Sequence, residues 1–474
     1  MADTRYAAGT IKIKNANGKL VPFYPKTDSS VLMTSNGTPV SNALSEMEEQ
    51  IEAAENSGGM DILYTSNVEE DSADAKNETL LVCFPLPEED DFVFTVDTRL
   101  YDGYNGTVDN TNRYSGIPFN LCDQSAVLDV DWGDGQTSHL TSSNYSSSST
   151  SASTHRYSVA GIYTIRVKCS SWDSVYLFSM NESLLGSSRN FYSYMSFLQY
   201  YRRTLVSVDS PIPPVKGTGY WTNASSGSTA TTFQDNSMQY SFAYCTKLKS
   251  TAAAMFSKCR HITSYTRAFQ HCYSLECIAD STFRNCSNAT TFQYCFYNCE
   301  SLKEIADNAF WNCSKASSFL YCFYGCSSLN SLPRRLFYGC SSISTMQYTF
   351  RGCTSLKSIP SDLFKWCGDK LASLDDCFYY CTSLTDIPIS LFKGCTALTN
   401  ISYMFNYIGT GYGNSITIDL TDSPNIQSVS YVVDHWSGIT LTVYVKNRTT
   451  THSTLKYASM NYSNYDSRIN VIAV

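Results

Sequence analysis

Phenylalanine and cysteine recur along this chain at a regular spacing. The pattern Phe-x-x-Cys occurs twelve times, from Phe242/Cys245 to Phe392/Cys395, and successive phenylalanines are alternately 14 and 13 residues apart over most of this stretch. Leu and Ile recur between them at fixed positions. Such a period is typical of a solenoid, whose repeats bury their apolar side chains by stacking on one another. The pattern predicts a stack of 27-residue coils, each built from two half-repeats.

The consensus of these repeats carries a resemblance. The string Phe-x-x-Cys-Thr/Ser-Ser-Leu-x-x-Ile-Pro-x-x-Leu-Phe resembles the leucine-rich repeats of the BspA-like family. The resemblance implies a right-handed solenoid over residues 205–408, with one short strand per coil at Leu-x-x-Ile and one helical or irregular segment. One extra residue, in the stretch Gly368-Asp369-Lys370-Leu371, should form a bulge in one turn.

A different pattern precedes the repeats. Apolar and polar residues alternate at Leu128/Val130/Trp132 and again at Tyr163/Ile165/Val167, which predicts half-buried strands. The string Val-Asp-Trp-Gly-Asp-Gly at 130–135, followed by His-Arg-Tyr-Ser-Val-Ala-Gly at 155–161, is similar to the PKD family. The similarity implies an immunoglobulin-like β-sandwich over residues 80–177, with a linker at 60–79 before it and a connector at 178–204 after it.

The first 59 residues form a separate module. Val40, Leu44, Met47 and Ile51 follow a heptad pattern, which predicts a short coiled coil. Two heptads are marginal as an isolated helix, so self-association is the simplest way to keep this helix ordered.

The segment before this helix carries a further resemblance. The string from Phe23 to Val40, which contains Tyr24, Pro25, Lys26 and Thr27, resembles the amino-terminal attachment segment of phage head-fibre and tail-fibre proteins. The resemblance implies a homotrimer that binds a phage capsid or tail protein through its N-terminus, with the virion as its location.

Residues 409–474 are expected to cap the repeats. Alternating apolar residues predict strands at 416–420, 439–445 and 469–472, and residues 455–462 are predicted to form a helix. The predicted fold class is therefore mixed and mainly β: an anchor with a short coiled coil, a sandwich, and a solenoid with a C-terminal cap.

The chain contains 19 cysteines, 16 of them between Cys245 and Cys395. A disulfide framework, zinc sites and a catalytic nucleophile are the functional alternatives, but zinc would call for Cys-x-x-Cys pairs or histidine partners, which do not recur here. Because one cysteine recurs at the same place in each half-repeat, we predict a ladder of buried thiols. The ladder consists of Cys245, Cys259, Cys272, Cys286, Cys299, Cys313, Cys326, Cys340, Cys353, Cys367, Cys381 and Cys395.

Other candidate chemistry is sparse. Asp129, Asp131 and Asp134 could bind Ca²⁺, although Asp-Gly at 134–135 is first a turn signal. The six histidines have no metal-binding or triad spacing, and no nucleotide-binding or hydrolase motif is present. We expect no enzymatic activity, no cofactor and no metal.

Charge and hydropathy narrow the possible partners. The net charge of −8 and the lack of a basic block argue against nucleic acid. No window approaches 18 apolar residues, and the start of the sequence lacks the pattern of a signal peptide, so we expect synthesis in a cytoplasm without membrane insertion.

Tyrosine is unusually frequent, with 35 residues, and many tyrosines fall between the apolar positions of the repeats. Tyr and Trp give large contact areas at low entropic cost, and they also suit stacking on sugars. The alternative is that these rings pack between coils. The candidate ligand-binding residues are Tyr324, Tyr338, Trp366, Tyr379 and Tyr380.

These observations predict a structural phage fibre, with a head fibre slightly favoured over a tail fibre. Its repeats would adhere to a host-surface glycan, a host protein or mucin. The alternative is a bacterial cell-surface BspA-like adhesin, and a third interpretation is an intracellular scaffold.

Overall fold

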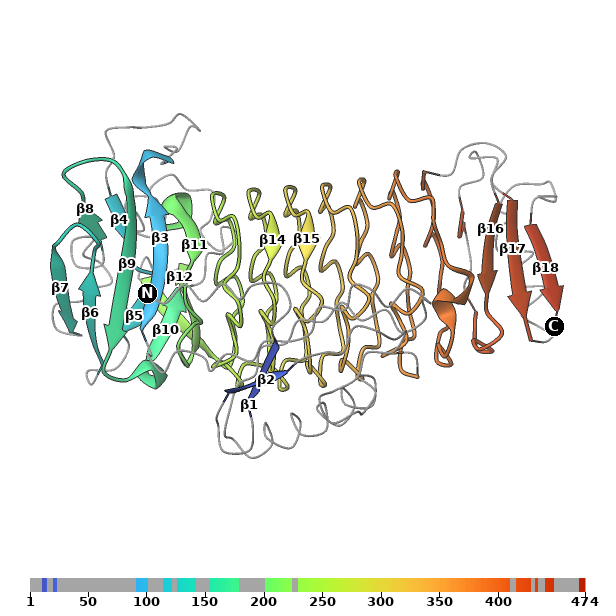
Figure 1. The fold of residues 1–474 in the computed structure, drawn as a ribbon, viewed down its shortest axis with the longest axis horizontal. Coiled ribbons are helices and arrows are strands. Elements are labelled where there is room, and N and C mark those ends of the chain that lie inside the picture. Colours follow the sequence, from blue (N-terminus) through green and yellow to red (C-terminus); the bar gives the residue numbers. More distant parts are fainter. Residues whose placement is uncertain are drawn as a thin grey trace. The chain divides into compact units, whose positions relative to one another are not determined.

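The fold is seen in a computed structural model (Figure 1). It describes residues 11–14, 20–23, 91–100, 114–121, 126–141, 154–178, 201–223, 229–367, 369–409, 415–427, 431–433, 440–446 and 469–473. The chain divides into two units, Met1–Glu89 and Asp90–Val474. In the first unit, β1 (Ile11–Lys14) pairs antiparallel with β2 (Leu20–Phe23). The predicted anchor residues Tyr24–Thr27 and the predicted coiled coil lie outside the described residues.

The second unit begins with two β-sheets. One has the strand order β11-β3-β9-β6-β7, and the other has the order β13-β12-β10-β5. Phe92 of β3 meets Phe119 of β5 with ring centroids 5.2 Å apart, so the sheets pack on each other through aromatic side chains. The strands of the first sheet are β3 (Phe92–Asp97), β6 (Val127–Asp131), β7 (Thr137–Thr141), β9 (Ile162–Cys169) and β11 (Leu205–Val208). Those of the second are β5 (Phe119–Leu121), β10 (Val175–Phe178), β12 (Gly217–Asn223) and β13 (Thr229–Asp235).

Two smaller features belong to the same region. A short pair is formed by β4 (Tyr114–Gly116) and β8 (Thr154–Arg156). The half-buried strands predicted around Val130 and Ile165 are confirmed as β6 and β9, which pair antiparallel. The alternation of their burial follows from the period of two in a strand.

Strand β11 joins these sheets to the repeats. Leu205 pairs antiparallel with Val96 of β3, whereas Ser207 also forms a parallel bridge with Ser250 of the first full coil. The apolar core is therefore continuous from the sheets into the coils.

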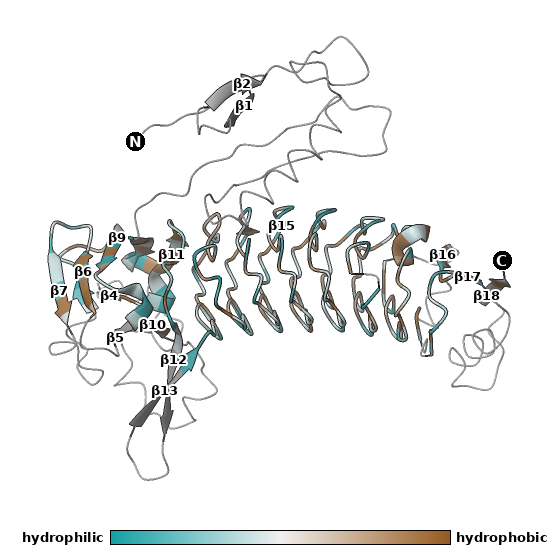
Figure 2. Cartoon of the chain, turned by 90° about the horizontal axis from the view of Figure 1, so that it is seen from below, coloured by the Kyte–Doolittle hydropathy of each residue, from teal (hydrophilic) through white to brown (hydrophobic). Residues whose placement is uncertain are grey.

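The coils stack through backbone hydrogen bonds between equivalent positions. The amides of Tyr294 and Phe296 donate to the carbonyls of Leu320 and Cys322, one coil further on, at 2.9 and 2.8 Å. Parallel bridges run through Ser264, Thr291 and Ser318 in steps of 27 residues. Figure 2 shows hydrophobic and hydrophilic residues alternating around each coil.

The interior is a set of stacked rings. Phe269, Phe296 and Phe323 are fully buried, and their successive centroids lie 5.1 and 5.5 Å apart with planes within 2° of parallel. In the other half-repeat, Phe256 and Phe283 stack at 5.0 Å. Because a coil cannot bury these rings alone, stacking is what stabilises it.

Regular secondary structure in the coils is sparser than predicted. Two-residue strands occur at Leu-x-x-Ile in two coils, β14 (Cys277–Ile278) and β15 (Glu304–Ile305), and other contacts are single bridges. In place of a helical segment, the described coils contain turns and one 3-10 helix, η5 (Ile389–Phe392). Two further 3-10 helices lie in the sheet region, η1 (Thr98–Leu100) and η2 (Trp172–Ser174).

The extra residue near position 368 is visible in the register. The bridge from Thr345 to Ser373 spans 28 residues, whereas the bridges between Ser237 and Thr345 each span 27. Gly368 itself lies outside the described residues.

The C-terminal part contains the three predicted strands. They are β16 (Ser415–Asp419), β17 (Thr440–Val445) and β18 (Ile469–Ala473), and they form a parallel sheet in the order β16-β17-β18. The helix predicted at 455–462 lies outside the described residues. The described part of the chain is thus mainly β, with few helical residues.

Candidate binding faces

The half-repeats that hold Phe296, Phe323 and Phe350 carry rows of tyrosines. Tyr294, Tyr321 and Tyr348 stand two residues before these phenylalanines, so they form one row along the stack. Their ring centroids are 4.7 and 4.4 Å apart, and their planes are within 5° of parallel. All three side chains are partly buried. The interlocked coils therefore hold these rings in register.

A second row lies beside the first. Tyr297 and Tyr324 stand one residue after their phenylalanines and stack with centroids 4.9 Å apart. The two rows touch, because Tyr321 and Tyr324 have centroids 5.7 Å apart. We call the two rows, together with Arg351 and Tyr379 of the second row, the tyrosine face.

An ion pair between neighbouring coils interrupts the two rows. Arg351 occupies a tyrosine position of the second row, and Asp376 occupies one of the first row. The Arg351 guanidinium donates to the Asp376 carboxylate and lies over the ring of Tyr379, 3.9 Å from its centroid. Burial, with Asp375 adding to it, raises the pKa of Asp376 to about 6 in spite of Arg351.

The tyrosine face also changes the acidity of its own phenols. Burial raises the pKa of Tyr321 to about 12, and the neighbouring Tyr348 and Tyr294 add to the effect. Burial, followed by Asp376 and Asp375, raises the pKa of Tyr348. At neutral pH these phenols are protonated, so each hydroxyl can both donate and accept a hydrogen bond.

The backbone of the tyrosine face is unusual. Tyr294, Tyr321 and Tyr348 have φ angles of 55–57°, in the left-handed region that L-residues with large side chains rarely adopt. At a second turn of the same coils, two residues after phenylalanine, the chain uses Gly325 and Gly352, with φ of 71° and 75°. The first row therefore keeps tyrosine where glycine would meet less strain.

The other half-repeats carry a different aromatic cluster. Trp311, Tyr338 and Trp366 follow the phenylalanines of these halves, and Tyr338 meets Trp366 edge-on at 4.5 Å. Cations lie over their rings: Arg335 is 5.8 Å from the centroid of Tyr338, and Lys365 is 4.9 Å from that of Trp366. We call these five residues the tryptophan corner.

The five predicted ligand-binding aromatics thus fall into two groups. Tyr324 and Tyr379 belong to the tyrosine face, and Tyr380 follows it in sequence with 51% of its surface exposed. Tyr338 and Trp366 belong to the tryptophan corner. The prediction missed Arg351 and Asp376, although an alignment of the repeats that allows for the extra residue near position 368 places both at tyrosine positions.

The predicted thiol ladder occupies the interior. The seventeen described cysteines are free thiols, and all twelve ladder members are buried. In most coils the thiol donates to the phenylalanine carbonyl 30 residues earlier, as from Cys299 Sγ to Phe269 O and from Cys326 Sγ to Phe296 O, both at 3.2 Å. Thr349 Oγ1 makes the analogous bond to Phe319 O. Burial raises the pKa of Cys286 to about 12, so this thiol is a poor nucleophile.

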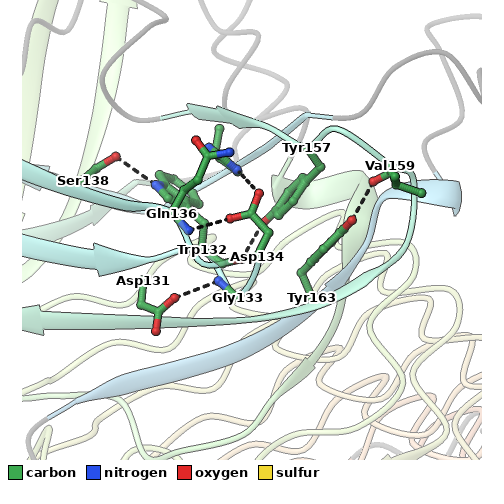
Figure 3. Close-up of polar contacts among 10 residues, drawn as sticks. Asp131, Trp132, Gly133, Asp134, Gln136, Ser138, Tyr157, Val159 and Tyr163 are labelled. Carbon is green, nitrogen blue, oxygen red and sulfur yellow. Dashed lines mark hydrogen bonds and ion pairs between the residues drawn. The ribbon is translucent and has the colours of Figure 1, made fainter.

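Two of the three acidic residues considered for Ca²⁺, Asp131 and Asp134, accept hydrogen bonds within a turn (Figure 3). Asp131 accepts from the amide of Gly133, and Asp134 accepts from the amide of Gln136 and bonds His155. Asp129 bonds His139. Among the residues that the structure describes, no three His, Cys, Asp or Glu side chains gather as a metal site. Nor does any helix in that part of the chain have the length and apolarity to cross a membrane.

The repeats match a known family. Residues 230–414 match six copies of the BspA type leucine-rich repeat region. The sequences of curated proteins give no match. Among solved structures, the chain is similar to a leucine rich cell surface protein from Faecalibacterium prausnitzii, with 14% identity, a TM-score of 0.16, and coverage of 56% of this chain and 84% of that protein.

The repeat resemblance is therefore confirmed over the matched range. The segments that resemble a phage attachment segment and a PKD domain, at 23–40 and 80–177, lie outside residues 230–414, so both stay predictions.

Proposed function

We propose that this chain is an adhesin-like protein whose BspA-type repeats display a binding face toward a surface ligand. The observation that carries the proposal is the tyrosine face: repeated, partly exposed tyrosines held in register by a rigid stack of coils. Tyr-rich surfaces bind well because a rigid ring gives contact area and a hydroxyl at low entropic cost. The ligand we expect is a glycan, a protein or mucin on a host surface.

Binding fits the chemistry of the repeats better than catalysis. Burial raises the pKa of Cys286 and Cys395 to about 12, which suppresses their thiolates. The carboxylates of Asp131 and Asp134 are engaged in the hydrogen bonds of a turn. We accordingly propose no enzymatic activity and no cofactor.

The setting that we favour is a bacterial cell surface, because the matched repeats are of the BspA type, which the sequence resemblance associates with adhesins. A phage fibre is the second candidate. It rests on the sequence of residues 23–40, with Tyr24-Pro25-Lys26-Thr27, and on the heptad pattern that follows it. In that setting the chain would be a homotrimer located in the virion, and three sites per fibre would gain avidity without new contacts.

Fractionation of the native source separates the two settings. The adhesin predicts that antibodies detect the protein in the cell envelope and on intact cells, whereas the fibre predicts co-sedimentation with virions. Light scattering on the purified full chain adds a second criterion, because the fibre requires a trimer. A monomer absent from virions would eliminate the fibre.

The adhesin proposal itself is tested by binding. The purified full chain should bind bacterial or animal cells, or immobilised mucin, in a saturable way. If the chain binds none of these surfaces, although circular dichroism shows that it is folded, the proposed function is refuted.

A further inference from the structure

We propose that the tyrosine face recognises a neutral polysaccharide chain lying along the stack of coils, and that it does so through phenol hydroxyls and ring edges rather than ring faces. The inference rests on the proposed adhesin function and specifies the ligand class of that same site.

The first step concerns which part of each ring is accessible. Tyr321 lies between Tyr294 and Tyr348, parallel to both, with centroids 4.7 and 4.4 Å away. Tyr324 has Tyr297 on one side at 4.9 Å and Arg351 on the other at 6.0 Å. Both faces of these inner rings are covered by neighbours, yet the side chains remain partly exposed. What they offer to a ligand is therefore their edges and hydroxyls, so the stacking of sugars on ring faces, expected from the sequence, is disfavoured here.

The second step concerns why tyrosine stands at these positions. At φ near 55°, glycine or asparagine is far less strained than a bulky residue. The chain uses both elsewhere, with Asn298 at φ of 55° and Gly325 at 71°. Residues held in strained backbone conformations cluster at functional sites such as ligand clamps. Ring stacking alone would be served by phenylalanine, so the hydroxyl is the feature left to explain.

The third step concerns charge. The two half-repeats that carry Tyr294 and Tyr321, residues 287–299 and 314–326, contain a single charged residue, Lys315. Its ammonium group bonds the side chain of Asn288 at 2.7 Å. Arg351 is likewise paired with Asp376, and Arg267, which lies over the ring of Tyr294, donates to the hydroxyl of Tyr240. The face therefore offers hydroxyls with little net charge, which favours a neutral ligand over an acidic one.

The fourth step concerns the shape of the ligand. The hydroxyl-bearing rings repeat every 4.4–4.9 Å along the stack, so a polymer with regularly spaced hydroxyls can repeat the same contact from coil to coil. An extended peptide binds mainly by pairing its backbone with a free strand edge. Here the amides of Tyr294, Phe296 and Tyr321 already donate to the next coil. A polysaccharide, which hydrogen bonds through hydroxyls, suits this face better than a peptide.

The test uses the full chain and the triple variant Tyr294→Phe, Tyr321→Phe and Tyr348→Phe, which keeps the stacked rings and removes three hydroxyls. The probes are immobilised dextran, amylose and mannan, with hyaluronan as the acidic comparison. We expect saturable binding of the wild type to at least one neutral probe, and a roughly tenfold or greater loss in the triple variant at an unchanged melting temperature. Tyr163→Phe, in strand β9 of the sheet region, removes a hydroxyl that donates to Val159 O outside both candidate faces, so it is the matched control and should bind like the wild type.

Chain length gives a second readout. Oligosaccharides cut from the bound polysaccharide should inhibit better as they lengthen, because longer chains contact more coils. A monosaccharide that inhibits as well as a long oligomer would overturn the inference, as would full binding by the triple variant or preferential binding to hyaluronan.

The two levels of proposal fail separately. If the wild type binds cells or mucin but none of the neutral polysaccharides, this inference is wrong and the adhesin function stands. If it binds none of the cells, mucin or polysaccharides, the adhesin function is refuted as well.

Discussion

In the half-repeat that ends at Cys299, Phe296 stacks on Phe269, and in the half-repeat that ends at Cys286, Phe283 stacks on Phe256. Both halves bury the same kind of ring and the same thiol. Outside, they differ: one half carries rows of self-stacked tyrosines, with an arginine over the ring at each end, and the other carries Trp311, Tyr338 and Trp366, each with a cation over its own ring. The interior of a repeat is fixed by stacking, whereas its outer residues can diverge between halves without disturbing the coil.

The charged residues sharpen this difference. The half-repeat at 300–313, which contains Trp311, has four charged residues, and the one at 354–367 has three. The tyrosine halves at 287–299, 314–326 and 341–353 have none, one and one, and charge returns to this side of the repeat only at 368–381, which has four. We therefore expect substitutions of interior residues to lower the free energy of unfolding by similar amounts in both halves. Substitutions of exterior residues should have different effects in the two halves.

The largest expected effect is on stability and tests the equivalence of the interiors. Phe296→Ala and Phe283→Ala each remove a fully buried ring that stacks on both sides, so each should lower the free energy of unfolding by about 3–5 kcal/mol. Urea denaturation of the full chain measures both. Costs that differ by more than about 2 kcal/mol would show that the halves are not equivalent, since that exceeds the spread of such sites.

The next effect belongs to the tyrosine half and depends on pH. The pKa of Asp376 is raised to about 6 by burial, above its usual range, so the folded state binds this proton more tightly than the unfolded state. The stabilisation it gives is full below about pH 4 and is lost as the pH rises through 6. Between pH 4 and 7, Asp376 should lower the free energy of unfolding of the wild type by about 1–3 kcal/mol. Asp376→Asn should lack this part of the decrease.

Melting curves of the wild type and Asp376→Asn at several pH values check this prediction. The difference between the two proteins isolates Asp376 from other carboxyls, such as Asp307, whose pKa burial also raises. A difference that does not change with pH would contradict it.

A smaller effect concerns the thiols and again compares the halves. Cys326→Ala and Cys313→Ala remove hydrogen bonds to the carbonyls of Phe296 and Phe283, 3.2 and 3.3 Å long, and leave a small cavity. Each should cost about 1–2 kcal/mol. Cys322→Thr should cost less, because Thr349 holds the equivalent place one coil later.

Thiol labelling provides an independent measurement. Among the described cysteines, a maleimide at pH 8 should react in the native state at Cys169 and Cys277, which are only partly buried, and at the ladder cysteines only after unfolding. Rapid labelling of Cys299 in the native protein would contradict the packing seen here.

The sequence predicted the interior better than the exterior. Phenylalanine and cysteine at a 27-residue period predicted the repeats, because a stack tolerates few residues at its buried positions. The sequence did not predict that Tyr324 and Tyr338 would belong to separate faces, or that Arg351 would bond Asp376. Both arrangements depend on the path of the turns, which the residue pattern does not determine. The short strands were over-predicted because single bridges suffice to hold neighbouring coils.

The smallest expected effect tests whether the tyrosine row serves stability or recognition. Tyr321→Asn removes two ring stacks, each contributing about 0.5–1.5 kcal/mol. It also relieves a left-handed backbone that costs roughly 1–2 kcal/mol for a bulky residue. Because the terms oppose each other, the free energy of unfolding should change by less than about 1 kcal/mol, while polysaccharide binding falls. If urea denaturation instead shows that the free energy of unfolding falls by several kcal/mol, the tyrosine row serves stability, as the stacked phenylalanines do. The main difference between the two halves of the coil would then disappear.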